Sequence, residues 1–406
     1  MTIKVTLYPQ ARLASACFYL LLPGFFIYHV LVGQQLFPAL LGGYSTAMAV
    51  ILLLPLSLAY ALHLLQLPNH RLSLDIIYMS FIVYYAVLLL VVSAVSPRGA
   101  AALEQIGIVF QFLVLFMVAR LAPLGEPRFQ RWLLIFLVIM TATIAFNADE
   151  GTFIIVALEL QELGTNLANY QAYAFVYSVV ALYVLAPIRQ RWKRVLIYAV
   201  CIPALFVNGA RTEFIGMILL VLLLEFMESK HKLMTLLVTC LLAAIGVAAL
   251  PFLAEAYPES RTVFLFLDYS DDISAMERSV MLRDGWRGIM ENPFLGSFGS
   301  YAPGAHIHNG LSAWVDLGLL GFVVYAGLIA VPMLDLSLLR RPDLRSPSYR
   351  LAFSMLFLSA LFAVMAKHFT HQLLPLALGI YSRYLIETPR RRTSVEEFVI
   401  RKVAVV

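Results

Sequence analysis

Charged residues are scarce in this sequence, and their scarcity argues against a soluble protein. Asp, Glu, Lys and Arg make up 13% of the 406 residues, whereas soluble domains carry about a quarter. So few charges cannot cover the surface of a water-soluble protein of this length. Hydrophobic residues make up 61%, and the mean hydropathy is +0.85. This composition indicates an all-α, polytopic membrane protein.

Cysteine is also rare, and the three that are present lie within apolar segments, at Cys17, Cys201 and Cys240. Without a pair of cysteines in loops, the sequence offers neither a disulfide framework nor the ligand spacing of a metal site. The net charge of +5 is modest, and the basic residues gather in particular loops, so no nucleic-acid partner is expected. We predict no metal and no cofactor.

Twelve apolar segments approach the length of about 20 residues that a helix needs to cross a bilayer. The first follows Lys4 and Arg12, as the core of a signal peptide would, but it lacks a small-residue cleavage site, so we expect a retained first helix. The seventh and eighth are separated only by Gly209, Ala210 and Arg211. The expected spans are 13–32, 44–63, 75–95, 102–119, 132–148, 168–187, 194–210, 212–228, 233–253, 309–335, 350–366 and 369–386.

The distribution of basic residues orients these spans, because cytoplasmic loops are enriched in Lys and Arg. With the N-terminus in the cytoplasm, all but seven of the 29 Lys and Arg residues fall on the cytoplasmic side. An even number of spans then places both termini there. The predicted parts are transmembrane helices 1–9 (1–253), a long outer loop (254–308), transmembrane helices 10–12 (309–388) and a basic cytoplasmic tail (389–406). The seven outer cations are Arg98, Arg211, Arg261, Arg278, Arg283, Arg287 and Lys367.

The outer loop 254–308 is too long for a simple connection, and it is rich in aromatic residues that can pack onto a membrane domain. The stretch "ISAMERSVMLRDGWRGIM" has the periodicity of a helix, with Met276, Val280, Trp286 and Ile289 on one face. Pro and Gly in "ENPFLGSFG" predict the turn that ends it.

Arginines on the outer side oppose the topological bias, so each requires a reason. Arg211 lies between two apolar segments in "FVNGARTEFIG" and either extends to the lipid headgroups or faces a polar cavity. For Arg261, Arg278 and Arg283, the plain alternative is a solvated or headgroup-facing loop.

His308 stands at the start of an apolar segment in "SYAPGAHIHNGLSAWVDLGLLG". A histidine there is commonly a cap or a packed polar group, but its near-neutral pKa also suits a general base. Asn309 can cap the following helix, and Asp316, two turns inside it, requires a partner. Gly318 and Gly321 allow another helix to approach closely.

Three stretches together resemble the O-antigen ligase and polymerase superfamily. "GSFGSYAPGAHIHNGLSAWVDLGLLG" resembles its signature of His followed by Asn, with a glycine pair in the next helix. "ERSVMLRDGWRGIMENPFLGSFG" is similar to its pattern of Arg, Trp, Asn-Pro and a glycine-rich turn, and "NGARTEFIG" to its element of a small residue followed by Arg. The motifs lie within 208–321, and the expected architecture of spans and one dominant outer loop is similar as well.

The resemblance implies a GT-C-like, all-helical glycosyltransferase of the bacterial inner membrane with its site on the periplasmic face. Its partners would be an undecaprenyl-diphosphate-linked O-antigen as donor, a lipid A–core oligosaccharide as acceptor, and membrane lipids. Arginines bind phosphate oxygens bidentately and can replace a metal beside the leaving diphosphate. On this hypothesis His308 is the general base, and Arg211, Arg261 and Arg278, with Arg283 as a further candidate, bind the diphosphate.

Other acceptors and another class of protein remain open. An O-antigen polymerase or a protein O-oligosaccharyltransferase would share the superfamily, but polymerases commonly show two large outer loops and protein-glycosylating relatives tend to be longer. A lipid-linked glycan transporter is disfavoured because no internal repeat is evident and the polar residues gather at one face. The roles of His306, Lys367 and His368, the sugar specificity and the oligomeric state are not fixed by the sequence.

Overall fold

The structure is a computed structural model that describes residues 8–39, 44–67, 73–95, 105–149, 152–153, 169–257, 260, 262–263, 273–299, 301, 306–339 and 343–388, without the side chains of 8, 149, 152, 242–243 and 273–277. Arg261 and the basic tail at 389–406 lie outside the described residues.

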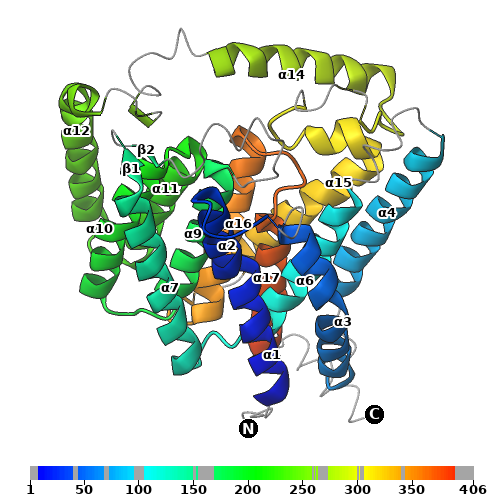
Figure 1. The fold of residues 1–406 in the computed structure, drawn as a ribbon, viewed down its shortest axis with the longest axis horizontal. Coiled ribbons are helices and arrows are strands. Elements are labelled where there is room, and N and C mark those ends of the chain that lie inside the picture. Colours follow the sequence, from blue (N-terminus) through cyan, green and yellow to red (C-terminus); the bar gives the residue numbers. More distant parts are fainter. Residues whose placement is uncertain are drawn as a thin grey trace, which may run out of the picture.

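Helices account for nearly all of the described chain (Figure 1). A two-residue strand pair, β1 (Ala148–Asp149) and β2 (Thr152–Phe153), is antiparallel, with Ala148 opposite Phe153. The helices are α1 (Tyr8–Tyr19), the π-helical turn η1 (Leu20–Gly24), α2 (Phe25–Gly33), α3 (Tyr44–Leu65), α4 (Ser73–Val95), α6 (Ile106–Leu121), α7 (Pro127–Phe146), α9 (Tyr170–Leu185), α10 (Arg191–Asn208), α11 (Arg211–Glu228), α12 (Lys232–Ala256), α14 (Ile273–Glu291), α15 (Ser312–Leu334), the π-helical turn η3 (Asp335–Leu339), α16 (Pro347–Met365) and α17 (Leu373–Glu387).

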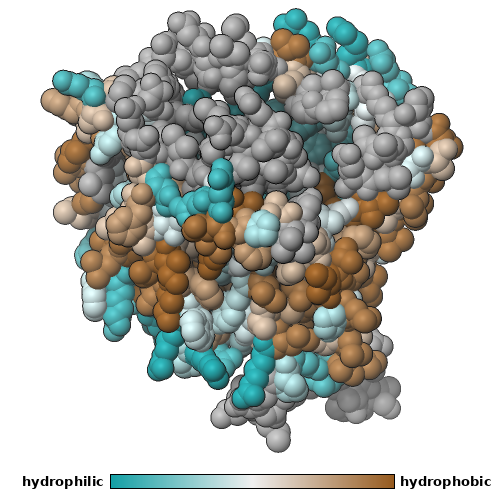
Figure 2. Space-filling model, in the orientation of Figure 1, coloured by the Kyte–Doolittle hydropathy of each residue, from teal (hydrophilic) through white to brown (hydrophobic). Residues whose placement is uncertain are grey.

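Among the residues that the structure describes, seven helical stretches are long and apolar enough to cross a membrane: Pro9–Gly33, Tyr44–Leu65, Ser73–Val95, Pro127–Phe146, Lys232–Ala256, Ser312–Leu339 and Pro347–Met365. On the face shown in Figure 2, hydrophobic residues predominate across the middle, with hydrophilic residues below them. The chain is therefore an all-helical, multi-pass membrane protein. The other five predicted spans fall on α6, α9, α10, α11 and α17, which are shorter or more polar, so the count of twelve stays a prediction.

The division predicted between 194–210 and 212–228 is confirmed as a break between two helices. Gly209 ends α10 with φ 77°, a left-handed conformation that glycine adopts without strain. Arg211 is then the first residue of α11. The break places the arginine at a helix start instead of inside a continuous apolar helix.

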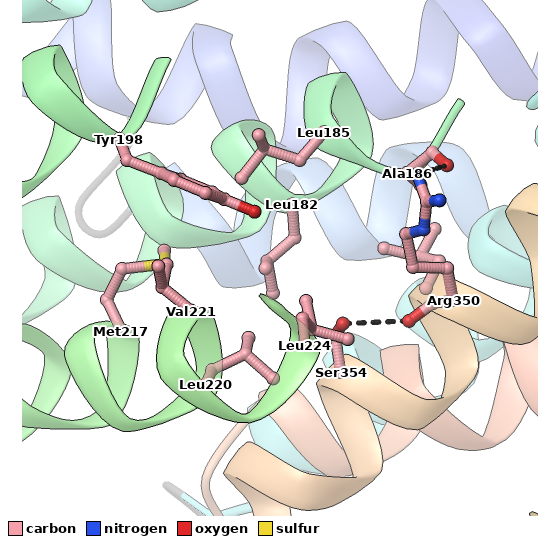
Figure 3. A pocket seen from close by; sticks show the side chains of 11 residues that line it. Leu182, Leu185, Ala186, Tyr198, Met217, Leu220, Val221, Leu224, Arg350 and Ser354 are labelled. Carbon is pink, nitrogen blue, oxygen red and sulfur yellow. Dashed lines mark hydrogen bonds between the residues drawn. The ribbon is translucent and has the colours of Figure 1, made fainter. Parts of the chain in front are cut away.

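α14 lies across one end of the bundle, far from the start of α1 (Figure 1). It packs against α15, while α12 stands at the periphery beside α11. The interior consists mainly of α6, α9, α16 and α17, in which most residues are buried. The space between α9, α10, α11 and α16, whose lining is drawn in Figure 3, has a volume of only about 10 Å³, barely enough for one water molecule. This region is therefore close-packed.

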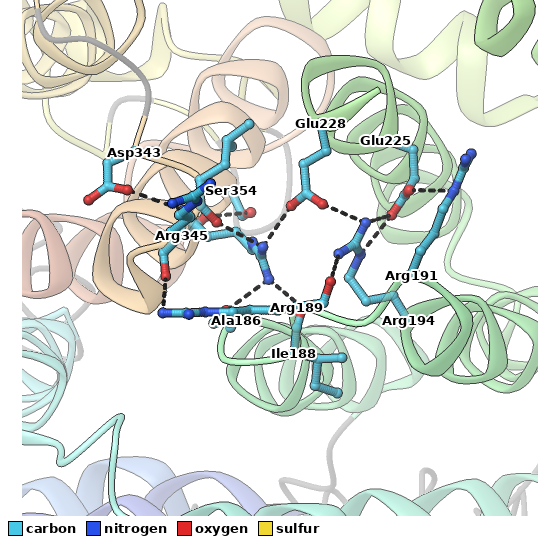
Figure 4. A network of polar contacts seen from close by, with 12 residues as sticks. Ala186, Ile188, Arg189, Arg191, Arg194, Glu225, Glu228, Asp343, Arg345 and Ser354 are labelled. Atoms are coloured by element: carbon cyan, nitrogen blue, oxygen red, sulfur yellow. Dashed lines mark hydrogen bonds and ion pairs between the residues drawn. The ribbon is translucent and has the colours of Figure 1, made fainter. Parts of the chain in front are cut away.

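At the end of the bundle opposite α14, a network of ion pairs joins α10, α11 and α16 (Figure 4). The Arg350 guanidinium lies 2.7 Å from Glu228 Oε1 and donates to the carbonyl oxygens of Ala186 and Ile188. Arg194 pairs with both Glu225 and Glu228, at 2.7 and 2.6 Å. Arg194 and Arg350 are buried, so two of the cations that the sequence analysis assigned to the cytoplasmic side hold helix ends together.

Candidate functional site

The turn between α14 and α15 is fixed to the first turns of α15 by backbone and side-chain hydrogen bonds. The Pro293 carbonyl accepts from Trp314 Nε1 at 2.8 Å and from the Leu319 amide at 3.0 Å. The Ser297 amide donates to the Val315 carbonyl at 2.6 Å. These bonds tie the C-terminal end of α14 to α15, the helix that follows the segment with His306 and His308.

Gly318 allows this contact, in a way that the sequence analysis did not foresee. It was expected to let a helix approach, but it has φ 70° and ψ −176° and interrupts α15 where the backbone of Phe294 and Leu295 comes close. Gly321 does face a helix: a Cβ there would lie 3.1 Å from the ring of Tyr84 in α4. Only the expectation for Gly321 is therefore confirmed.

A cavity of about 360 Å³ opens between the start of α11, α14, the segment 307–309 and the end of α16. Its polar lining comes from Arg211, Thr212, Arg278, Ser279, His308 and Asn309, and α11, α14 and α16 add apolar side chains. The structure thus brings together three of the four predicted site residues, Arg211, Arg278 and His308. Arg261 lies outside the described residues, and Arg283 is exposed on α14 without lining the cavity.

The His308 imidazole has the character of a neutral base. Its pKa is lowered first by burial and then by the positive charges of Arg278, His368 and Lys367. Asn309, expected to cap the helix, instead accepts a hydrogen bond from the Leu311 amide at 2.9 Å, while α15 begins at Ser312. Asn309 therefore shapes the turn before the helix.

A row of three imidazoles leads from the cavity to a buried carboxylate. The ring centroids of His308 and His306 are 4.7 Å apart, and those of His306 and His368 are 4.8 Å apart. His368 Nε2 lies 3.3 Å from Asp316 Oδ2, which also accepts from Tyr301 Oη at 2.8 Å. Asp316 thus has the partners that its place inside α15 requires. The pKa of His306 is lowered to about 4, by burial and then by His368 and His308.

Lys367, whose role the sequence left open, is buried and paired with a carboxylate. Its Nζ lies 2.7 Å from Glu213 Oε1 and donates to Gln171 Oε1 at 3.2 Å. Sequence reasoning missed Glu213, whose signal was a carboxylate in the first turn of an apolar helix.

The arrangement combines two guanidinium groups and a neutral imidazole with an apolar wall, a set suited to an anionic substrate that carries a lipid. No ion pair of the described residues includes Arg278. Within the same described part of the chain, no cluster of His, Cys, Asp or Glu has the geometry to hold a metal ion. Comparison with known proteins finds no family model and no curated protein that matches the chain.

Proposed function

We propose that this protein is a membrane glycosyltransferase of the O-antigen ligase type. It would transfer a glycan from undecaprenyl diphosphate to a sugar hydroxyl of lipid A–core at the periplasmic face of the bacterial inner membrane. The proposal includes twelve spans, a GT-C-like fold and two cytoplasmic termini. One observation carries it: Arg211, Arg278 and His308, from three separate segments, line one cavity with an apolar wall.

The proposed reaction uses each part of this cavity. His308 accepts the proton of the acceptor hydroxyl while that oxygen forms its bond to the anomeric carbon, and the bond from this carbon to the diphosphate oxygen breaks with inversion. Arg211 and Arg278 bind the leaving diphosphate, whose charge rises as the bond breaks. The apolar side chains of α11 and α16 would contact the first isoprene units. A general base of this kind contributes a factor of about 10²–10⁴.

The proposal is tested with purified protein in proteoliposomes, radiolabelled undecaprenyl-diphosphate glycan, lipid A–core and EDTA. We expect transfer in EDTA, a loss of about 10²-fold or more in His308→Ala, and no loss in His231→Ala, which alters an exposed histidine at the start of α12. Full activity of His308→Ala would remove the general-base assignment.

The acceptor is tested in the same vesicles. Transfer to added pilin or to further donor, with none to lipid A–core, would replace the ligase assignment by a protein oligosaccharyltransferase or a polymerase. Movement of the labelled donor across the bilayer without transfer would indicate a transporter.

A further inference from the structure

A second polar cavity lies at the end of the bundle opposite α14, enclosed by the start of α1 and the ends of α3, α6 and α17. Its volume is about 280 Å³, and its polar lining comes from Gln10, His63, Arg120, Arg383 and Glu387. None of these residues has a part in the proposed transfer reaction.

Three polar atoms from different helices around this cavity are buried without a partner among the described atoms. They are Gln10 Oε1 of α1, His63 Nδ1 of α3 and Arg120 Nη2 of α6. Buried polar groups are nearly always hydrogen-bonded, because leaving one unpaired forfeits its hydration. Their presence around one cavity indicates a ligand with both acceptor and donor groups.

Arg120 is held rigidly enough to form a built site. Its side chain is 1% exposed, and its Nε lies 3.0 Å from Asp75 Oδ1. Asp75 of α4 also accepts from Tyr60 Oη of α3 and Ser382 Oγ of α17, each at 2.6 Å, so two further helices hold the carboxylate that fixes Arg120. With Nε used by Asp75, Nη2 remains as a donor for a phosphate oxygen.

The cavity also contains groups that favour a cation. Arg383 provides a second guanidinium, and its Nε lies 2.6 Å from Glu387 Oε1. The cavity lining therefore includes two acceptors, the Glu387 carboxylate and the Gln10 amide oxygen, beside the two arginines. Glu387 Oε2 also accepts from Ser348 Oγ, so the Gln10 oxygen is the acceptor that a simple phosphate would leave without a donor. A phosphate joined to an ammonium group would use both kinds of partner.

The surroundings favour a lipid over a soluble zwitterion. In α3, His63 is flanked by Leu58, Leu62 and Leu65, which are exposed; Leu65 is 83% exposed. α3 is one of the helices apolar enough to span the membrane, so acyl chains would cover this face. A headgroup at the end of α3 can therefore enter the cavity while its chains stay in the bilayer.

We propose that this cavity binds the headgroup of phosphatidylethanolamine, with the phosphate at Arg120, Arg383 and His63 and the ammonium group at Gln10 and Glu387. The bound lipid would join the ends of α1, α3, α6 and α17. The proposal does not depend on the transferase assignment.

The test measures the melting temperature of delipidated protein in detergent with added phosphatidylethanolamine, phosphatidylglycerol, soluble phosphoethanolamine or inorganic phosphate. Native mass spectrometry counts the bound lipids. We expect phosphatidylethanolamine to raise the melting temperature most, because a ligand that binds only the folded state stabilises it. His63→Leu and Gln10→Leu should weaken its binding at least tenfold. Arg120 is left intact because Asp75 would otherwise lose its buried partner.

Gln66→Leu is the matched control, since it removes an exposed glutamine just beyond the end of α3 and should bind like the unaltered protein. Equal stabilisation by phosphatidylglycerol would overturn the headgroup assignment, and an equal effect of phosphoethanolamine or inorganic phosphate would show an anion site without a lipid. Equal binding by all variants would show lipid on the outer surface only. No shift with any ligand would show a cavity that holds water.

Discussion

Replacing Gly318 with alanine should damage both stability and transfer, because two independent constraints act on this residue. Its φ of 70° with ψ of −176° belongs to a region that is essentially restricted to glycine. A Cβ would also lie 2.2 Å from the Phe294 carbonyl oxygen and 2.7 Å from the Leu295 carbonyl carbon. Both are backbone atoms, so no rotamer change relieves the contact.

The size of the effect follows from these constraints. Holding an alanine in such a conformation costs about 1–3 kcal/mol. Moving the turn away weakens the bonds that Pro293 accepts from Trp314 and Leu319, each worth about 0.5–1.5 kcal/mol. We therefore expect the free energy of unfolding to fall by about 2–5 kcal/mol. Because the turn continues from α14, Arg278 should shift, and misplacement of about 1 Å can cost about 10²-fold in rate.

The assay compares Gly318→Ala with Gly327→Ala on the same helix, where a Cβ would meet nothing within 4 Å. Unfolding by SDS in mixed micelles gives the stability, and transfer by the folded fraction gives the activity. Gly327→Ala should be neutral or slightly more stable, since alanine favours a helix. Equal behaviour of the two variants would refute the argument.

Three further experiments test other parts of the structure. Arg350→Met should lower the free energy of unfolding by about 2–4 kcal/mol, less than the full loss of a buried pair, because Glu228 keeps Arg194; an unchanged SDS titration would contradict this. Lys367→Met should destabilise the protein more than the double variant Lys367→Met/Glu213→Leu, because the single variant leaves the buried Glu213 carboxylate unpaired and the double variant removes it. The same SDS titration compares the two variants. Transfer should fall as the pH drops through the lowered pKa of His308, since protonation removes the base. Arg278→Gln removes one cause of the lowering, so the acid limb of its rate–pH profile should lie at higher pH, whereas the acid limb of Arg278→Lys should not move.

The approach of Arg211, Arg278 and His308 was predictable because Arg211 and His308 lie at the edges of apolar segments and Arg278 lies in the long loop before His308. The predicted alternation of spans puts all three on the same side, and the structure has them around one cavity. The break after Gly209 was predictable for a similar local reason, since glycine and a charged residue interrupt the apolar pattern. These features depend only on neighbouring residues and on the count of crossings.

Other features depend on packing between distant segments and could not be predicted. The pair of Lys367 with Glu213 joins positions far apart in the chain, and neither residue indicates the other. The sequence around Gly318 has the pattern of a continuous helix, and only the approach of the turn at 293–297 explains the break. From the sequence the role of Lys367 stayed open, because only the packing of α11 against the end of α16 brings it to the Glu213 carboxylate.

The histidine row suggests how the site tolerates the charge that catalysis would create. A proton on His308 would stand close to the positive charge of Arg278, which disfavours it. His306 and His368 continue from His308 to Asp316, whose carboxylate is 1% exposed and fixed by Tyr301. In such an interior a carboxylate acts over a longer distance than in water. Asp316 partly offsets the lowering of the pKa of His306, the ring next to His308, and it contacts His368 directly. The base, its neighbours and the turn that Gly318 permits therefore form one structural unit.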